Sequence, residues 1–164
     1  MLADGHATLR HALRRLLDQA AGIEVIAEAG DLATVRRLVH ADRPRVLVID
    51  LSFSNGSTIG AIRNLREAVP STRIVALTME PSRVFARAAL DAGASGLVLK
   101  QLADEELVEA VRSAARGDEY LSPHQFDAAR STEPSGHRPA ARVPIAATQT
   151  SAADRVGHST ADVT

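Results

Sequence analysis

The chain has 164 residues, of which 45% are hydrophobic, and a formal net charge of −1. This length predicts one domain of ordinary size plus a tail, and the balanced charge gives no sign of a polyanion-binding surface. The chain has no cysteine, which excludes disulfides and thiolate metal sites. Its N-terminus lacks an uncharged apolar stretch long enough for a signal peptide or a membrane span, so we expect a cytoplasmic protein without membrane contact.

Residues 1–121 alternate short apolar runs with amphipathic stretches. Apolar residues at helical spacing predict five helices, and continuous apolar runs predict five strands between them. Strands that are apolar throughout are typical of a parallel sheet covered on both faces. We therefore predict an α/β fold with a doubly wound, five-stranded parallel sheet. The strands are expected at 1–3, 23–29, 46–49, 74–77 and 97–99, and the helices within 7–21, from Asp31 to Val39, at 59–69, from Pro81 through Leu90 and from Asp104 to near Gly117.

Polar side chains stand at the ends of four of these strands. Asp4 follows the first strand, Asp50 the third and Lys100 the fifth, while Thr78 closes the fourth. The functional crevice of such a sheet lies beyond the carboxyl ends of its strands, so we expect these four side chains to converge there. Each alone is a weak signal, because Asp50 could simply cap a loop and threonine is common in strands. Lys100, however, is the only lysine among 19 basic residues.

The order and spacing of several motifs resemble a known family. The chain is similar to the receiver domain of bacterial two-component response regulators of the NarL/LuxR type, and the likeness covers nearly all of residues 1–121. This resemblance implies a flavodoxin-like strand order of 2-1-3-4-5 for a receiver (response regulatory) domain at 1–121. The motifs are LADGHATLRHALRRLL, VLVIDLS, IVALTM, and AGASGLVLK followed by ADEELVEAVRSAARGDEYLSP.

The resemblance also implies a role for each of the polar residues. Asp50 would be the phosphoacceptor, Lys100 the lysine that pairs with the phosphoryl group, Thr78 the switch hydroxyl and Asp4 part of an acidic Mg²⁺ pocket. A carboxylate can indeed form an acyl phosphate, and a cation can neutralise the transferring group. Mg²⁺ takes oxygen ligands, which Asp4, Asp50 and the Ser52 backbone carbonyl could supply. The implied partner is a histidine kinase, and a second receiver is a further candidate.

Two substitutions depart from the family pattern at the metal pocket and the switch, and in the loop after Asp50 the residues Phe53, Ser54 and Thr58 stand where Met, Pro and Gly are usual. Gly5 stands where the family has a second acid that contacts the metal, so Mg²⁺ binding is expected to be weakened. Leu97 replaces the aromatic switch residue. These departures favour an alternative, a pseudo-receiver that acts as an interaction module with little phosphotransfer. A turnover enzyme with an aspartate nucleophile, such as a haloacid-dehalogenase-type phosphatase, needs an acid where Ser52 stands. We therefore expect a phosphoacceptor domain and no turnover enzyme.

The two ends of the chain are also unusual for the family. Only Met1–Ala3 precede Asp4, which makes the first strand short and is consistent with a misassigned start codon. Residues 122–164 hold four of the seven prolines and show no helical or alternating period, so we predict a disordered tail with no recognisable domain. A LuxR-type helix-turn-helix would be usual there. Without it we do not expect direct DNA binding by this chain, and we expect a frameshift or the remnant of a longer transcriptional regulator.

The histidines carry no pattern of their own. His6, His11 and His40 lack metal-ligand spacing, and we expect them on the surface.

Overall fold

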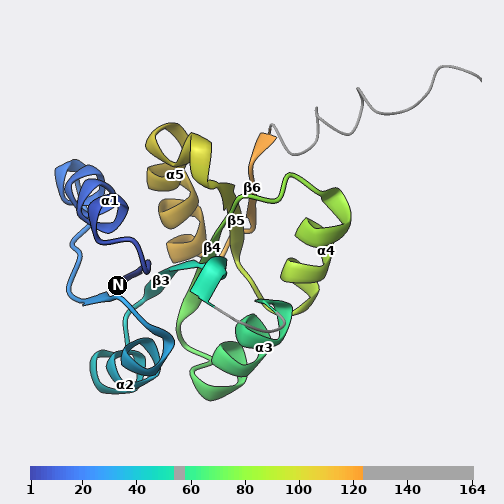
Figure 1. Ribbon diagram of the computed structural model, residues 1–164, viewed down its shortest axis with the longest axis horizontal. Helices are drawn as coiled ribbons and strands as arrows, with labels where there is room; N and C mark the ends of the chain where they lie inside the picture. Colours follow the sequence, from blue (N-terminus) through green and yellow to red (C-terminus); the bar gives the residue numbers. More distant parts are fainter. Residues whose placement is uncertain (54–57, 124–164) are drawn as a thin grey trace, which may run out of the picture. The chain divides into compact units, whose positions relative to one another are not determined.

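The computed structural model describes residues 1–53 and 58–123, and shows one parallel sheet with helices on both faces (Figure 1). The strand order is β2-β1-β3-β4-β5-β6. The doubly wound parallel sheet and its order are thus confirmed, and a sixth strand extends the five that were predicted. The tail predicted to be disordered lies outside the described residues from 124 onward. The strands are β1 (Leu2–Ala3), β2 (Glu28–Ala29), β3 (Val46–Asp50), β4 (Arg73–Thr78), β5 (Gly96–Leu99) and β6 (Tyr120–Leu121).

Helices pack on both faces of this sheet. In Figure 1, α1 and α5 lie on one side of the strands, and α2, α3 and α4 lie on the other. Short 3₁₀ turns at Leu51–Phe53 and Lys100–Leu102 follow β3 and β5, at the edge where the site lies. The helices are α1 (Ala7–Gln19), α2 (Leu32–Asp42), α3 (Thr58–Ala68), α4 (Arg83–Asp91) and α5 (Ala103–Arg116).

The position of β3 between two layers of helices explains why its sequence is apolar without alternation. All five of its residues are buried. Leu47 and Ile49 pack in the cluster formed with α2, α3 and α4, whereas Val46 and Val48 pack in the cluster formed with α1 and α5. Because both faces are covered by helices, successive side chains of one strand enter two different cores. The fifth residue is Asp50, which therefore ends a fully buried strand.

The first two strands are shorter than the sequence predicts. Residues 23–29 were expected to form a strand, but only Glu28–Ala29 pair with Leu2–Ala3. The reason lies in β1, which begins at Leu2: Leu2 N donates to Ala27 O at 3.0 Å, and residues 23–26 have no residue of β1 beside them. The chain passes the sheet there with Val25 buried and Ile26 exposed.

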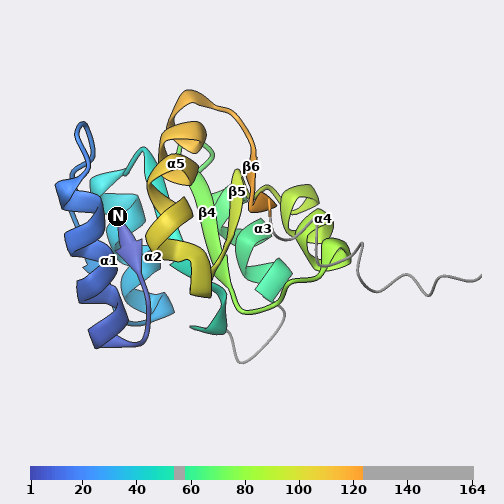
Figure 2. The same cartoon turned by 90° about the horizontal axis from the view of Figure 1, so that it is seen from above.

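The sixth strand closes the other edge of the sheet. Tyr120 N donates to Ser95 O at 3.0 Å, and Ser122 N donates to Leu97 O at 3.1 Å, so this segment runs beside β5. Ser122 is fully buried as a result. Figure 2 shows β6 lying alongside β5, with α5 next to them. Two residues are too few for a periodic signal, which is why sequence patterns did not indicate this strand.

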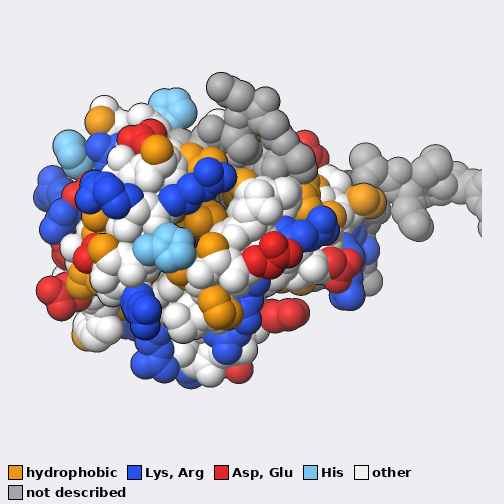
Figure 3. All heavy atoms as spheres, turned by 90° about the horizontal axis from the view of Figure 1, so that it is seen from below, with side chains coloured by type: hydrophobic (Ala, Val, Ile, Leu, Met, Phe, Trp, Pro, Cys, Tyr) orange, Lys and Arg blue, Asp and Glu red, His pale blue; other side chains and the backbone are white. Residues whose placement is uncertain are grey.

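The surface carries charges of both signs. Figure 3 shows arginine and acidic side chains interspersed with histidine and apolar side chains on one face of the molecule. Among the helices of the described residues, none has the length and apolar character needed to cross a bilayer.

Candidate functional site

The four residues predicted at the strand ends meet at the carboxyl edge of the sheet. Asp4 follows β1 directly, Asp50 is the last residue of β3, Thr78 is the last of β4 and Lys100 follows β5. Parallel pairing of β1 with β3, of β3 with β4 and of β4 with β5 brings these positions to one edge. Asp4 is fully buried, and Asp50 is 2% exposed.

Lys100 joins the two aspartates. Its Nζ lies 2.6 Å from Asp50 Oδ2 and 3.2 Å from Asp4 Oδ2, and its side chain is 10% exposed. An ionised carboxylate is costly to bury without a partner. One ammonium placed between two carboxylates offsets much of that cost and leaves the trio with a net charge of −1. This arrangement explains why a buried apolar strand can end in an aspartate.

Ser52 donates two further hydrogen bonds to the Asp50 carboxylate. Its backbone N donates to Asp50 Oδ1 at 2.9 Å, and its hydroxyl donates to Asp50 Oδ2. Both bonds come from the 3₁₀ turn that follows β3. Together with Lys100 they fix the carboxylate orientation at the mouth of the crevice. The predicted role of the Ser52 carbonyl as a metal ligand remains a prediction.

Asp4 is held by the segment that opens α1. The backbone N of His6 donates to Asp4 Oδ1 at 2.7 Å, and His6 Nδ1 lies 3.3 Å from the same oxygen. Arg10 Nη1 donates to the Asp4 backbone carbonyl at 2.6 Å, and its Nε donates to Glu28 at 3.3 Å. His6 is exposed, as expected, yet its imidazole lies against the buried carboxylate. The spacing of the histidines did not predict this contact, although the position of His6, two residues after Asp4, was a signal for it.

Thr78 shares a cleft with Asp50. This cleft of roughly 390 Å³ is lined by the two residues together with Ser52, Met79 and Phe85. Thr78 is 6% exposed, and its Oγ1 accepts a hydrogen bond from Glu80 N at 3.0 Å. The hydroxyl proton of Thr78 therefore remains available for a group bound in the cleft.

Gly5 and Leu97, the departures from the family pattern at the metal pocket and the switch, lie in different environments. Gly5 is exposed, between Asp4 and His6. Leu97 is fully buried, in the core cluster beneath α4. The leucine side chain contributes packing there and offers no polar group that could alternate between core and solvent.

The ligand set fits a divalent cation. One oxygen each of Asp4 and Asp50 and a ring nitrogen of His6 all lie within 4.8 Å of one another. Carboxylate oxygens suit Mg²⁺ and Mn²⁺, and an imidazole nitrogen suits transition metals. The fold is that of a signalling receiver domain, with two aspartates and a lysine in contact at the carboxyl edge of its parallel sheet.

Comparison with known families agrees with this class. The sequence matches the response regulator receiver domain family over residues 1–112, which is more than half of the chain. The chain therefore belongs to this family, whose members are signalling domains.

Its curated relatives are response regulators of the NarL/LuxR type. The oxygen regulatory protein NreC of Staphylococcus carnosus is 36% identical over 124 residues, which cover 75% of this chain and 57% of that protein. The nitrate/nitrite response regulator protein NarP of Escherichia coli is 34% identical over 122 residues, which cover 74% of this chain and 57% of that protein. The chain thus spans less than two thirds of the length of these two relatives.

Solved receiver structures are also similar. A LuxR-family two-component response regulator from Aurantimonas sp. SI85-9A1 superposes with a TM-score of 0.73 at 35% identity, covering 81% of this chain and 96% of that one. The isolated receiver domain of RcsB from Salmonella enterica serovar Typhimurium, solved with phosphomimetic BeF3−, superposes with a TM-score of 0.70 at 27% identity. That match covers 77% of this chain and 94% of that one.

Proposed function

We propose that the chain is a phosphoaccepting receiver that takes a phosphoryl group on Asp50 from a histidine kinase. The observation that carries this proposal is the position of Lys100 Nζ, 2.6 Å from Asp50 and 3.2 Å from Asp4, together with the cleft that Asp50 lines. A structural ion pair would not need a cleft beside it, whereas a phosphoryl group needs both a nucleophile and a cation.

In the proposed step, a carboxylate oxygen of Asp50 forms a bond to phosphorus. The bond between phosphorus and the donor atom breaks, and the donor leaves with that electron pair, so that Asp50 carries an acyl phosphate. Lys100 neutralises the charge on the transferred group, and Ser52 orients the attacking carboxylate. The donor is a phosphohistidine of the kinase or a small acyl phosphate.

Thr78 then acts as the switch. Its hydroxyl donates to an oxygen of the phosphoryl group, which draws the end of β4 and the following residues Met79 and Glu80 toward Asp50. Both of these residues are exposed, so their movement changes the surface next to α4. This change would alter binding to a partner, for which a second receiver is one candidate.

A divalent cation would neutralise the remaining charge. Receiver domains generally bind Mg²⁺, and Asp4 and Asp50 are the carboxylates of this chain that would hold it. With Gly5 in place of a second acid, the pocket offers one carboxylate fewer, so we expect weak Mg²⁺ binding.

The second candidate function is a pseudo-receiver, an interaction module with little phosphotransfer. Gly5 and the fully buried Leu97 favour it, because one removes a metal ligand and the other removes the aromatic switch. In that case the charged trio would serve stability, and the function would lie in the surface that the fold presents.

Intact mass after incubation with acetyl phosphate tests the first candidate against the second. The chain is incubated with and without Mg²⁺, with Asp50→Asn as the control and Gly5→Asp as a variant that restores the acid. We expect an adduct of one phosphoryl group that requires a divalent cation, is absent in Asp50→Asn and increases in Gly5→Asp. If the folded chain forms no adduct with any divalent cation, the pseudo-receiver is the better description.

A further inference from the structure

We propose that His6 is a ligand of the cation in this pocket, so that the pocket prefers a first-row transition-metal dication such as Mn²⁺ or Co²⁺ over Mg²⁺. This inference rests on the cation site of the proposed function, but it concerns which ion the site selects.

The first argument is the position of the imidazole. His6 Nδ1 lies 3.3 Å from Asp4 Oδ1, which is close to the edge of about 3 Å between neighbouring ligands in an octahedral site. One oxygen each of Asp4 and Asp50 and a ring nitrogen of His6 lie within 4.8 Å of one another. The two carboxylates come from different strand ends, and the imidazole comes from the residue that precedes α1.

The second argument is that the His6 side chain is not used by the helix. His6 is the N-cap residue of α1, with φ −91° and ψ 101°, yet its side chain makes no capping hydrogen bond. Its backbone N instead donates to Asp4 Oδ1, which ties the residue to the buried carboxylate. The side chain is 73% exposed, so an ion can reach the ring from solvent.

The third argument is the donor chemistry. Gly5 lacks a ligand, and the carboxylates of Asp4 and Asp50 already share the positive charge of Lys100. Mg²⁺ binds best to hard, charged oxygens, and such a pocket offers it few. A neutral imidazole adds affinity for ions later in the Irving–Williams order and adds little for Mg²⁺. The selectivity of the pocket should therefore depend on His6.

A competing explanation is that His6 forms only an ion pair with Asp4 when the ring is protonated. Metal titration of the parent chain and of a variant without the imidazole separates the two explanations, because an ion pair adds no nitrogen ligand to a bound cation. The full chain is titrated by calorimetry with Mn²⁺, Co²⁺ and Mg²⁺ in turn. The absorption spectrum of bound Co²⁺ is recorded as well, since its bands report nitrogen ligation.

The variants are His6→Ala and, as a matched control, His11→Ala. His11 is an exposed histidine of α1 outside the cluster. We expect His6→Ala to weaken Mn²⁺ and Co²⁺ binding by about tenfold or more, and to shift the Co²⁺ bands, while Mg²⁺ affinity stays within about twofold. His11→Ala should change none of the three. Equal binding of Co²⁺ by the parent chain and His6→Ala, or tighter binding of Mg²⁺ than of Mn²⁺ by the parent chain, would overturn the proposal.

The titration needs no phosphorylation, so its outcome is separate from that of the proposed function. A chain that binds Co²⁺ through His6 but forms no phosphoryl adduct would retain this inference and lose the phosphoacceptor function. A chain that forms the adduct equally well with and without His6, and shows unchanged metal affinities, would do the reverse.

Discussion

A buried charge lies at each end of β1, and different groups compensate the two charges. At the carboxyl end, the carboxylate of Asp4 is fully buried, and Lys100 supplies an opposite charge 3.2 Å away. At the amino end, the α-ammonium of Met1 donates to the Val46 carbonyl at 3.0 Å. Burial lowers the pKa of this ammonium from its ordinary value of 8.0, and the Asp42 carboxylate raises it by a smaller amount. The charge at the carboxyl end is thus compensated by an opposite charge, and the charge at the amino end mainly by a hydrogen bond to a single carbonyl.

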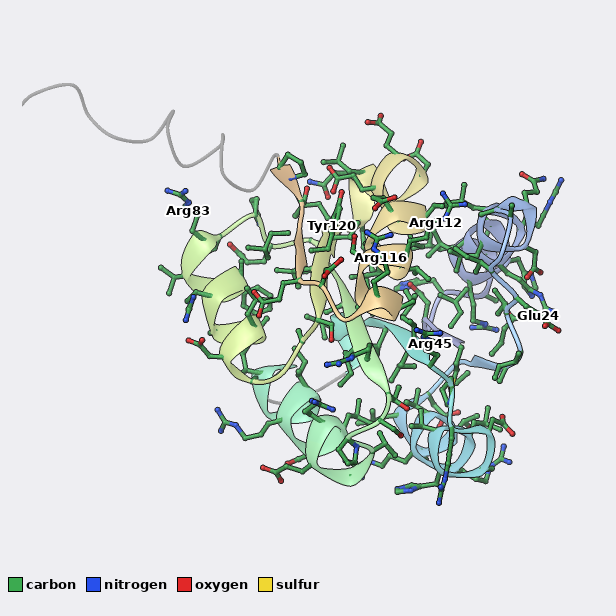
Figure 4. The ribbon with its side chains drawn as sticks, turned by 180° about the vertical axis from the view of Figure 1, so that it is seen from behind. Glu24, Arg45, Arg83, Arg112, Arg116 and Tyr120 are labelled. Carbon is green, nitrogen blue, oxygen red and sulfur yellow. The ribbon has the colours of Figure 1, made fainter. Side chains whose placement is uncertain are left out.

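Packing also differs between the two ends of β1. Beside Met1 lies a cavity of about 260 Å³ with largely apolar walls, including Leu17, Val25 and Val111. Two arginines fasten its rim: Arg45 donates to Ala115 O at 2.7 and 3.0 Å, and Arg112 donates to Ala21 O at 3.1 Å. Figure 4 shows both arginines on the same side of the fold, near α5. The carboxyl end of β1 thus holds charged groups in contact with one another, whereas the amino end borders a largely apolar cavity.

The largest expected effect comes from removing the compensating charge. Lys100→Met should leave two carboxylates buried together and lower the free energy of unfolding by about 2–3 kcal/mol at pH 7, as measured in urea. Adding Asp50→Asn to this variant should recover part of the loss, because one unpaired charge is then removed. A loss of less than about 0.5 kcal/mol in Lys100→Met would show that the pocket is well solvated and that the contrast between the two ends is small.

The next effect comes from filling the amino end. In the register of β1, the residue added directly before Met1 would lie opposite Val46 and point, like Leu2, toward α1 and α5. An extension of Met-Arg-Val should therefore raise the free energy of unfolding by about 1–2 kcal/mol over Met-Arg-Gly, because a valine side chain becomes buried. Both extensions remove the ammonium from this position. Equal stability of the two would mean that the cavity does not accept a continuation of β1.

The ammonium itself predicts a pH dependence. Because its pKa is lowered in the folded chain, the unfolded chain binds more protons between that pKa and 8.0. Stability should therefore rise with pH through this window, and should fall as the pH drops through the folded-state pKa. Thermal unfolding of the free and the Nα-acetylated chain, measured across this range, checks the prediction. The acetylated chain should lack this rise, and parallel profiles for the two would contradict it.

The smallest expected effect is at the Ser52 hydroxyl. Ser52→Ala removes its hydrogen bond to Asp50 but keeps the backbone bond at 2.9 Å, so stability should fall by only about 0.5 kcal/mol. Water can reach this exposed residue and replace the hydroxyl. The rate of phosphoryl transfer from acetyl phosphate should fall more clearly, because the carboxylate becomes less well oriented. Unchanged rates would assign Ser52 a purely structural role.

Local sequence determined the parts of the fold that depend on neighbours along the chain. A helix was predicted to begin at Asp31, and the Asp31 side chain accepts from Thr34 N at 2.8 Å at the start of α2. The apolar run before Asp50 predicted a strand buried on both faces, as found for β3. The strand predicted from the apolar pattern was wrong at 23–26, because a strand needs a partner and β1 reaches back only as far as Ala27. The pattern also did not predict the strand at Tyr120–Leu121, where two residues show no period.

The same distinction between local sequence and tertiary structure holds for the candidate site. The sequence by itself determined which groups stand at the strand ends, since a carboxylate or an ammonium that closes an apolar run is visible from neighbouring residues alone. Only the tertiary structure decided that Lys100 lies between Asp4 and Asp50, and that the His6 ring turns toward Asp4. Those contacts join residues that can be 96 positions apart, and their distances are set by how parallel strands pair and how helices pack upon them.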